Sequence, residues 1–261
     1  MSRRAVSSSR RFVQDNLPFF GSSQSKPRSH SCVPISLLSL GAVLFIFYAV
    51  GWLGDSTSNV STAEVDNPCT VEVQRAMPFL RKAYGDSLRR VLHVGPDTCS
   101  VVSMLLHGED EVGTEAWGVE PYDIEDADAN CKSMVRKGIV RVADLKFPLP
   151  YKSNSFSAVI VSDALDYLSP KYLNRSLPDL ARAASDSLII FAGFPGQQRA
   201  RTTSLSKYGR PAKPRSASWW IRYFVQTSLE ENEIALKKFT NAALKKSYKP
   251  LCQVFHLKPY R

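Results

Sequence analysis

Three carboxylates occupy similar positions in the sequence, each at or just after the end of a short apolar segment: Glu120, Asp144 and Asp163. A carboxylate in such a position can accept hydrogen bonds from the hydroxyl groups of a ribose or from an amine. Another apolar segment ends just before Gly95, where the absence of a side chain lets the backbone approach a ligand closely. These residue types favour a nucleotide-like ligand, although acids at strand ends also serve simply as helix caps.

The elements that must position these residues alternate between strand-like and helix-like patterns. The strand-like segments are short and almost continuously apolar, and they comprise residues 89–94, 116–120, 138–143, 156–162 and 187–193. Helical patterns separate several of them, at 99–108 and 170–184. Apolar strands joined by helical crossovers are typical of a parallel sheet covered on both faces. We therefore predict a doubly wound, Rossmann-like α/β fold that binds ligands at the carboxyl ends of its strands.

A membrane anchor is predicted near the N-terminus. Residues 33–53 carry no charged side chain, and a helix of this length could span the hydrocarbon of a bilayer. Residues 1–32 hold six basic side chains against one acid, so the positive-inside rule places them in the cytosol. Residues 54–68 form a polar lumenal stem and residues 69–261 a single lumenal domain. A cleaved signal peptide and a buried core helix are the alternatives to this type II signal anchor.

Two further features bear on the compartment. N-glycosylation sequons at Asn59 and Asn174 are compatible with a lumenal location. The five cysteines are widely scattered and show no metal-binding spacing, so we expect at most one or two disulfides, with the pairing left open.

Charge is distributed unevenly across the predicted lumenal part. Residues 55–196 carry 14 basic and 20 acidic side chains, whereas residues 197–261 carry 14 basic and 3 acidic ones. Because a secretory lumen holds no nucleic acid, the basic part favours an acidic polysaccharide or an anionic lipid surface as its partner, with simple solubility as the alternative. Within a basic insert at 196–217, interpreted as an acceptor-binding lid or a disordered loop, the candidate substrate-binding residues are Arg199, Arg201, Lys207 and Arg210.

One continuous segment, residues 144–160, has the sequence DLKFPLPYKSNSFSAVI. It resembles the D-x-x-x-L-P-F-x-D-x-S-F-D-x-V segment of Class I S-adenosylmethionine-dependent methyltransferases, and residues 164–168 resemble the segment that follows it. The resemblance implies that S-adenosylmethionine is the cofactor, that Glu120 binds its ribose hydroxyls, that Asp144 receives its adenine amine and that Asp163 lies near its methionine end. The candidate cofactor-binding residues are thus Gly95, Glu120, Asp144 and Asp163, and the candidate catalytic residues are Asp163 and Tyr167.

The first loop departs from the pattern of these methyltransferases. Where they have an acid followed by alternating glycines, this sequence has His93, Gly95, Asp97 and Cys99, so a single glycine remains. The departure leaves open a non-catalytic scaffold that positions other enzymes.

The whole chain, including the predicted anchor, resembles the plant cotton Golgi-related proteins from its MSRR start to its KPYR end. The resemblance implies an enzyme of the Golgi membrane that transfers methyl groups from S-adenosylmethionine to galacturonate carboxylates of homogalacturonan, an esterification of pectin in cell wall biogenesis. It also implies a complex with other Golgi enzymes of polysaccharide synthesis.

The residues also bear on two other classes of enzyme. A glycosyltransferase is suggested by the D-x-D sequence at 126–128, which could hold a divalent cation. A hydrolytic pectin esterase finds no support, because there is no G-x-S-x-G sequence and His93, His107 and His256 have no evident serine partner.

Overall fold

The computed structural model describes residues 68–107, 113–121, 124–196 and 211–260, all within one unit that spans 61–261. Outside them lie the predicted cytosolic tail, anchor and most of the stem, the sequon at Asn59, and the side chains of Arg199, Arg201, Lys207 and Arg210. Among the helices of these ranges, none has the length and apolar character that a membrane crossing requires.

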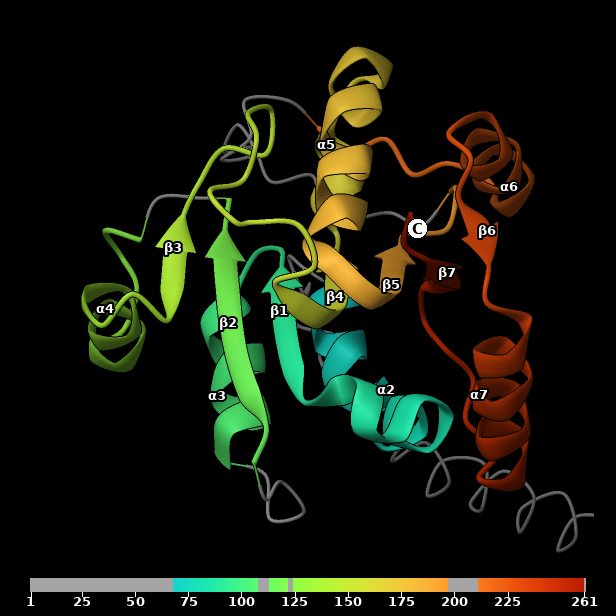
Figure 1. Cartoon of the computed structure of the whole chain (residues 1–261), viewed down its shortest axis with the longest axis horizontal. Coiled ribbons are helices and arrows are strands. Elements are labelled where there is room, and N and C mark those ends of the chain that lie inside the picture. Colours follow the sequence, from blue (N-terminus) through green and yellow to red (C-terminus); the bar gives the residue numbers. More distant parts are fainter. Residues whose placement is uncertain (1–67, 108–112, 122–123, 197–210, 261) are drawn as a thin grey trace, which may run out of the picture. The chain divides into compact units, whose positions relative to one another are not determined.

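A seven-stranded sheet lies at the centre of this unit, in the order β3-β2-β1-β4-β5-β7-β6 (Figure 1). Its strands are β1 (Arg90–Val94), β2 (Glu115–Glu120), β3 (Val140–Val142), β4 (Phe156–Ser162), β5 (Ala184–Ala192), β6 (Glu230–Glu231) and β7 (Gln253–Lys258). Strands β1 to β5 pair in parallel, whereas β7 is antiparallel to β5 and β6. The five predicted strands are confirmed, with β3 shorter and β5 beginning earlier than predicted. The prediction missed β6 and β7, which make one edge of the sheet antiparallel.

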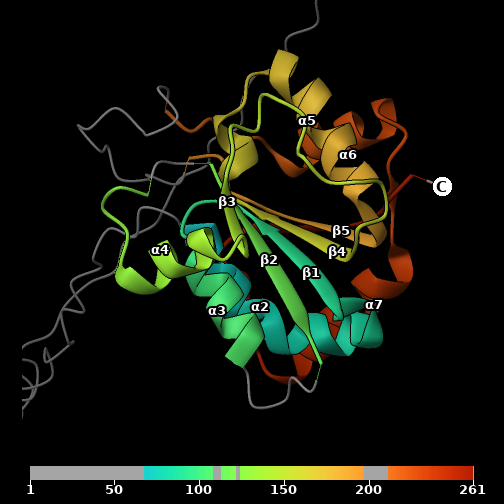
Figure 2. The same cartoon turned by 60° about the vertical axis from the view of Figure 1, so that its left-hand side comes forward.

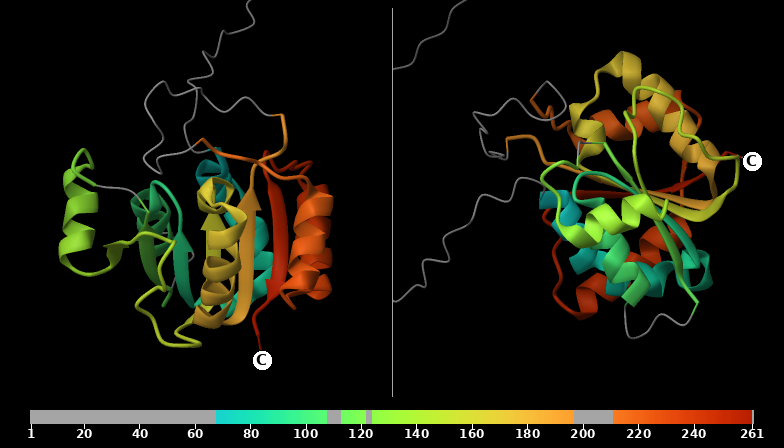
Figure 3. Two further views of the ribbon diagram at one scale, coloured as in Figure 1. Left: turned by 90° about the horizontal axis from the view of Figure 1, so that it is seen from above. Right: turned by 90° about the vertical axis from the view of Figure 1, so that its left-hand side faces the viewer.

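Helices cover both faces of the sheet, as a doubly wound fold requires. They are α2 (Pro68–Tyr84), α3 (Thr98–His107), α4 (Ala129–Arg136), α5 (Pro170–Ala183), α6 (Ala217–Gln226) and α7 (Glu233–Lys245), with short 3₁₀ helices η1 (Gly85–Leu88) and η2 (Ala164–Tyr167). Helices α5 and α6 lie on one face, and α2, α3 and α7 on the other (Figure 3). Helix α4 lies beside β3 (Figure 2), at the edge of the sheet opposite to β6 and β7 (Figure 1).

The strands feed two separate apolar cores because successive side chains point to opposite faces. In β4, Val159 and Val161 belong to the core under α5 and α6, whereas Ala158 and Ile160 belong to the core under α2, α3 and α7. A strand that is apolar on both faces is therefore the expected result of burial on both sides, and the mixed α/β, Rossmann-like class is confirmed.

Two disulfides join helix starts to other elements. Cys69, in the first turn of α2, bonds to Cys252, just before β7, across a sequence separation of 183 residues. Cys99 and Cys131 join the first turns of α3 and α4 across 32 residues. One or two disulfides were predicted at most, and two are present within the part of the chain that the structure describes. Such bonds persist in oxidising compartments.

Candidate functional site

The loop after β1 and the end of β2 meet at the carboxyl edge of the sheet. Gly95 N donates to Val119 O at 3.1 Å, and Thr98 N donates to Glu120 Oε2 at 3.1 Å. This hydrogen bond places the buried carboxylate of Glu120 at the first turn of α3, where the helix dipole stabilises a negative charge. The structure thus brings the predicted residues Gly95 and Glu120 together.

Close packing against β4 explains why residue 95 is glycine. A Cβ at this position would lie 2.5 Å from both the carbonyl oxygen and the hydroxyl of Ser162. Any side chain would force the loop after β1 away from β4 and change the shape of the edge.

Asp163 follows β4 with a φ of 56° and a buried side chain. Its Oδ2 accepts a hydrogen bond from Thr70 N at 2.8 Å and lies 3.3 Å from Thr70 Oγ1, so this carboxylate caps the N-terminus of α2. The Thr70 hydroxyl also lies 3.0 Å from Pro96 O and 2.7 Å from Ser162 Oγ. Thr70 was not predicted as a site residue, since its contacts come from residues far along the chain.

The other predicted residues lie at different depths of the same edge. Asp144 is exposed just beyond β3, where its Oδ1 accepts from Lys146 N at 2.9 Å and its Oδ2 lies 3.3 Å from Lys146 Nζ. The neighbouring Ala143 N donates to Glu120 O at 3.0 Å, which places this loop beside β2. Tyr167 is buried in η2.

His93, near the end of β1, stands where the methyltransferase pattern described above has an acid. Its Nδ1 lies 2.7 Å from Thr98 Oγ1, and its Nε2 lies 3.0 Å from Ser162 Oγ. The prediction that His93 lacks a serine partner is therefore wrong. Burial lowers the pKa of this imidazole to about 3, so it is neutral and a poor base, and the Ser162 hydroxyl is buried against Thr70. The pair joins β1 to β4 and offers no accessible nucleophile.

Stability should depend on pH through His93. Its pKa falls from the ordinary value of 6.5 to about 3 on folding, so the unfolded chain binds a proton below pH 6.5 that the folded chain does not. Stability from this group is present above pH 6.5 and is lost as the pH falls, by about 1.5 kcal/mol between pH 6.5 and pH 5. Urea unfolding at the two pH values should show that His93→Asn loses about 1.5 kcal/mol less stability than the wild type over this range. An equal change in the free energy of unfolding with pH in both proteins would contradict a neutral buried imidazole.

Relatives identify the chain once this geometry is known. Established family profiles give no match. "Probable pectin methylesterase CGR2" of Arabidopsis thaliana is 63% identical over 262 residues, and "Probable pectin methylesterase CGR3" of the same plant is 62% identical over 263 residues. Each alignment covers 99% of both chains. The chain belongs to the cotton Golgi-related family.

Solved structures resemble this member of the cotton Golgi-related family more distantly. The 1,6-didemethyltoxoflavin-N1-methyltransferase of Burkholderia thailandensis is 10% identical, covers 89% of this chain and 94% of its own, and gives a TM-score of 0.47. Geranyl diphosphate methyltransferase is 13% identical, covers 73% and 86% respectively, and gives 0.44. The fold class therefore rests on the strand order and the two helical layers described above.

Two segments of this cotton Golgi-related chain that carry predicted binding features contain residues with structural contacts. In the D-x-D segment, Asp128 Oδ1 accepts from Cys131 N at 2.6 Å and so caps α4. The described ranges contain no group of His, Cys, Asp or Glu side chains that could hold a metal ion. In the basic insert, Arg215 is buried and donates from Nη2 to Leu168 O at 2.7 Å. It therefore fastens the end of the insert to the segment after η2.

Proposed function

We propose that this protein transfers a methyl group from S-adenosylmethionine to galacturonate carboxylates of homogalacturonan. The observation that carries the proposal is Glu120, a buried carboxylate fixed by Thr98 N at the end of β2, beside a loop whose Gly95 admits no side chain. Such a carboxylate fits the hydroxyl pair of a ribose. The names of the two relatives, which include the words "pectin methylesterase", support pectin as the polymer.

The reaction needs orientation more than it needs a base. S-adenosylmethionine supplies an electrophilic methyl group when bound, and a galacturonate carboxylate is already ionised at neutral pH. Glu120 would fix the ribose end of the cofactor, and Asp144 would meet its adenine amine at the outer part of the edge. Holding both reactants in line is the contribution that proximity makes to such a transfer. A neutral His93 is consistent with this chemistry because no proton has to be removed.

Hydrolysis of the same ester is the rival that the relatives' names suggest. It requires a water or hydroxyl activated by a base. Ser162 and His93 have the right separation, but both are buried, and the pKa of the imidazole lies at about 3. The geometry therefore favours transfer over hydrolysis.

One experiment separates these functions. The full-length protein is incubated with polygalacturonate and methyl-labelled S-adenosylmethionine, and in parallel with methyl-esterified pectin alone. We expect labelled methyl ester in the first reaction and no methanol in the second. Methanol from the second reaction alone would establish an esterase, and neither product, together with no cofactor binding, would favour the scaffold.

We also propose that the protein is a type II protein of the Golgi membrane with this domain in the lumen. The two disulfides support an oxidising compartment. Asn174 supports glycan access, because it is exposed on α5 and holds Tyr223 OH through its Oδ1 at 2.8 Å, while its Nδ2 is the atom that carries a glycan.

Glycosylation at Asn174 can be measured directly. A glycosidase should increase the gel mobility of the wild-type protein, and Asn174→Gln should remove the part of this shift that depends on that residue. Substitution of Ser176 is the poorer test because its buried hydroxyl bonds to Leu145 O. An unchanged pattern in Asn174→Gln, with the domain digested by protease from the cytosolic side, would contradict the proposed orientation.

A further inference from the structure

A hollow of about 540 Å³ lies between α5 and the loop that follows β3. This volume falls in the range of small-molecule sites. Basic and apolar side chains dominate its lining, which includes Lys146, Phe147, Arg175, Pro178, Asp179 and Arg182. None of these residues belongs to the predicted basic insert.

The helical part of the wall is one face of α5. Arg175, Pro178, Asp179 and Arg182 follow the spacing i, i+3, i+4, i+7, which places their side chains in one stripe. The two arginines are separated along the helix by roughly 10 Å. Asn174 precedes this stripe, and its Oδ1 accepts a hydrogen bond from Tyr223 OH of α6 at 2.8 Å.

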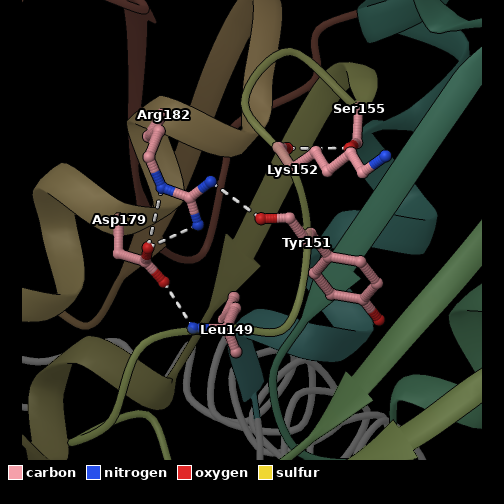
Figure 4. Close-up of polar contacts among 6 residues, drawn as sticks. All are labelled: Leu149, Tyr151, Lys152, Ser155, Asp179 and Arg182. Atoms are coloured by element: carbon pink, nitrogen blue, oxygen red, sulfur yellow. Dashed lines mark hydrogen bonds and ion pairs between the residues drawn. The ribbon is translucent and has the colours of Figure 1, made fainter.

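Hydrogen bonds fix Asp179 and Arg182, the last two residues of this stripe (Figure 4). Asp179 Oδ1 accepts from Arg182 Nε at 3.0 Å and Nη2 at 2.7 Å, and Asp179 Oδ2 accepts from Leu149 N at 2.6 Å. Arg182 Nη1 also donates to Tyr151 O at 2.7 Å. The acid of the wall is therefore satisfied, and the guanidinium beside it is held rigidly while its side chain remains 35% exposed.

Two other lining residues, Arg175 and Phe147, expose a cation and an aromatic ring to solvent. Arg175 is exposed and makes no ion pair with any residue in the described ranges. Phe147 is 68% exposed, which is unusual for a ring of this size. Guanidinium groups bind carboxylates through two parallel hydrogen bonds, and an aromatic face packs against the apolar face of a sugar ring.

One lining residue of this hollow contacts a predicted cofactor-binding residue. Lys146 lines the hollow, and its Nζ lies 3.3 Å from Asp144 Oδ2, the carboxylate expected at the adenine amine. Its Nζ also lies 5.8 Å from the centre of the Tyr172 ring on α5. A polymer held along α5 would therefore pass beside Asp144, at the adenine end of the proposed cofactor site.

We infer that the hollow is a binding subsite for an acidic polysaccharide, in which Arg175 and Lys146 take the carboxylates of uronate residues and Phe147 packs against a sugar ring. The inference rests on the proposed function for the identity of the polymer. It adds a place of contact on α5 and the loop after β3, separate from the basic insert.

The test measures binding of a galacturonate oligosaccharide to the full-length protein by calorimetry at low salt. Arg175→Gln and Phe147→Ala should each weaken binding about tenfold, the effect expected of one charge-assisted hydrogen bond or one buried ring face. Lys245→Gln, which removes an exposed cation of α7, is the matched control and should bind as the wild type does. Added salt should reduce the effect of Arg175→Gln.

Several outcomes would overturn the inference. The first is equal affinity for the oligosaccharide in Arg175→Gln and Lys245→Gln. The second is equal binding of a neutral galactose oligomer by the wild type. The third is that Arg175→Gln loses binding to phosphatidylserine vesicles while its binding to the oligosaccharide is unchanged. Cofactor affinity is measured in the same variants and should not change. If the wild type fails to bind S-adenosylmethionine but its oligosaccharide affinity still falls in Arg175→Gln, the proposed function fails and the subsite stands.

Discussion

Replacement of both Cys69 and Cys252 by alanine should lower the free energy of unfolding by about 5 kcal/mol. The bond closes a loop of 183 residues, and a crosslink of this length removes a large part of the conformational entropy of the unfolded chain. The measurement is urea unfolding of the two proteins in non-reducing buffer.

The second disulfide supplies the matched control. Cys99 and Cys131 are separated by 32 residues, so their replacement by alanine should cost about 4 kcal/mol by the same entropy relation. The Cys69–Cys252 bond, which closes the longer loop, also holds the start of α2, where Thr70 contacts Asp163 and Ser162. A smaller effect for the Cys69–Cys252 pair than for the Cys99–Cys131 pair would show that loop entropy does not determine these contributions.

Glu120→Gln should weaken binding of S-adenosylmethionine about 100-fold, or nearly 3 kcal/mol. Glutamine keeps the shape of the side chain, and its oxygen can still accept from Thr98 N. It replaces the second acceptor by a donor and removes the negative charge, so the paired ribose hydroxyls lose their charged acceptor. Calorimetric titration of the cofactor into the full-length protein measures the change.

Asp144→Asn serves as the comparison for Glu120→Gln. Because Asp144 is exposed and paired with Lys146, solvent and the lysine already compete for its charge, and we expect a loss of about fivefold. Urea unfolding of both variants controls for stability. Equal cofactor affinity in wild type and Glu120→Gln would favour the non-catalytic scaffold over the transferase.

The central sheet could be predicted because its strands are buried on both faces and therefore read as continuous apolar runs. Strand β7 escaped prediction since His256 interrupts its apolar character, yet that imidazole is buried and bonds through Nδ1 to Tyr84 OH at 2.7 Å. Tyr84 lies 172 residues earlier. A polar residue whose partner is so distant gives no local sign that it belongs to the core.

The same limit applies to the site. Glu120 was predicted from its place at the end of a strand, because that place follows from local pattern alone. The contacts of Asp163 with Thr70 and of His93 with Ser162 join residues 93 and 69 positions apart. Only the completed fold shows that His93, which breaks the expected loop pattern, is neutral and satisfied by Thr98 and Ser162.

Charge counts along the sequence do not reveal the hollow beside α5. Lys146, Arg175 and Arg182 belong to a segment with an excess of acidic residues, whereas the C-terminal part is strongly basic. In the structure Asp179 is engaged by Arg182 and by Leu149 N. Local pairing, which a count along the sequence does not show, decides where a net positive surface lies.

The long separation of Cys252 from Cys69 also has a consequence for biosynthesis. At a synthesis rate of about 5–20 residues per second, roughly 10–40 s separate the appearance of Cys69 from that of Cys252. During this interval Cys99 and Cys131 emerge first and are available to Cys69 as wrong partners, so native pairing depends on thiol–disulfide exchange. A premature stop anywhere between residues 132 and 251 would leave Cys69 without its native partner, so native pairing can be completed only after residue 252 has been made.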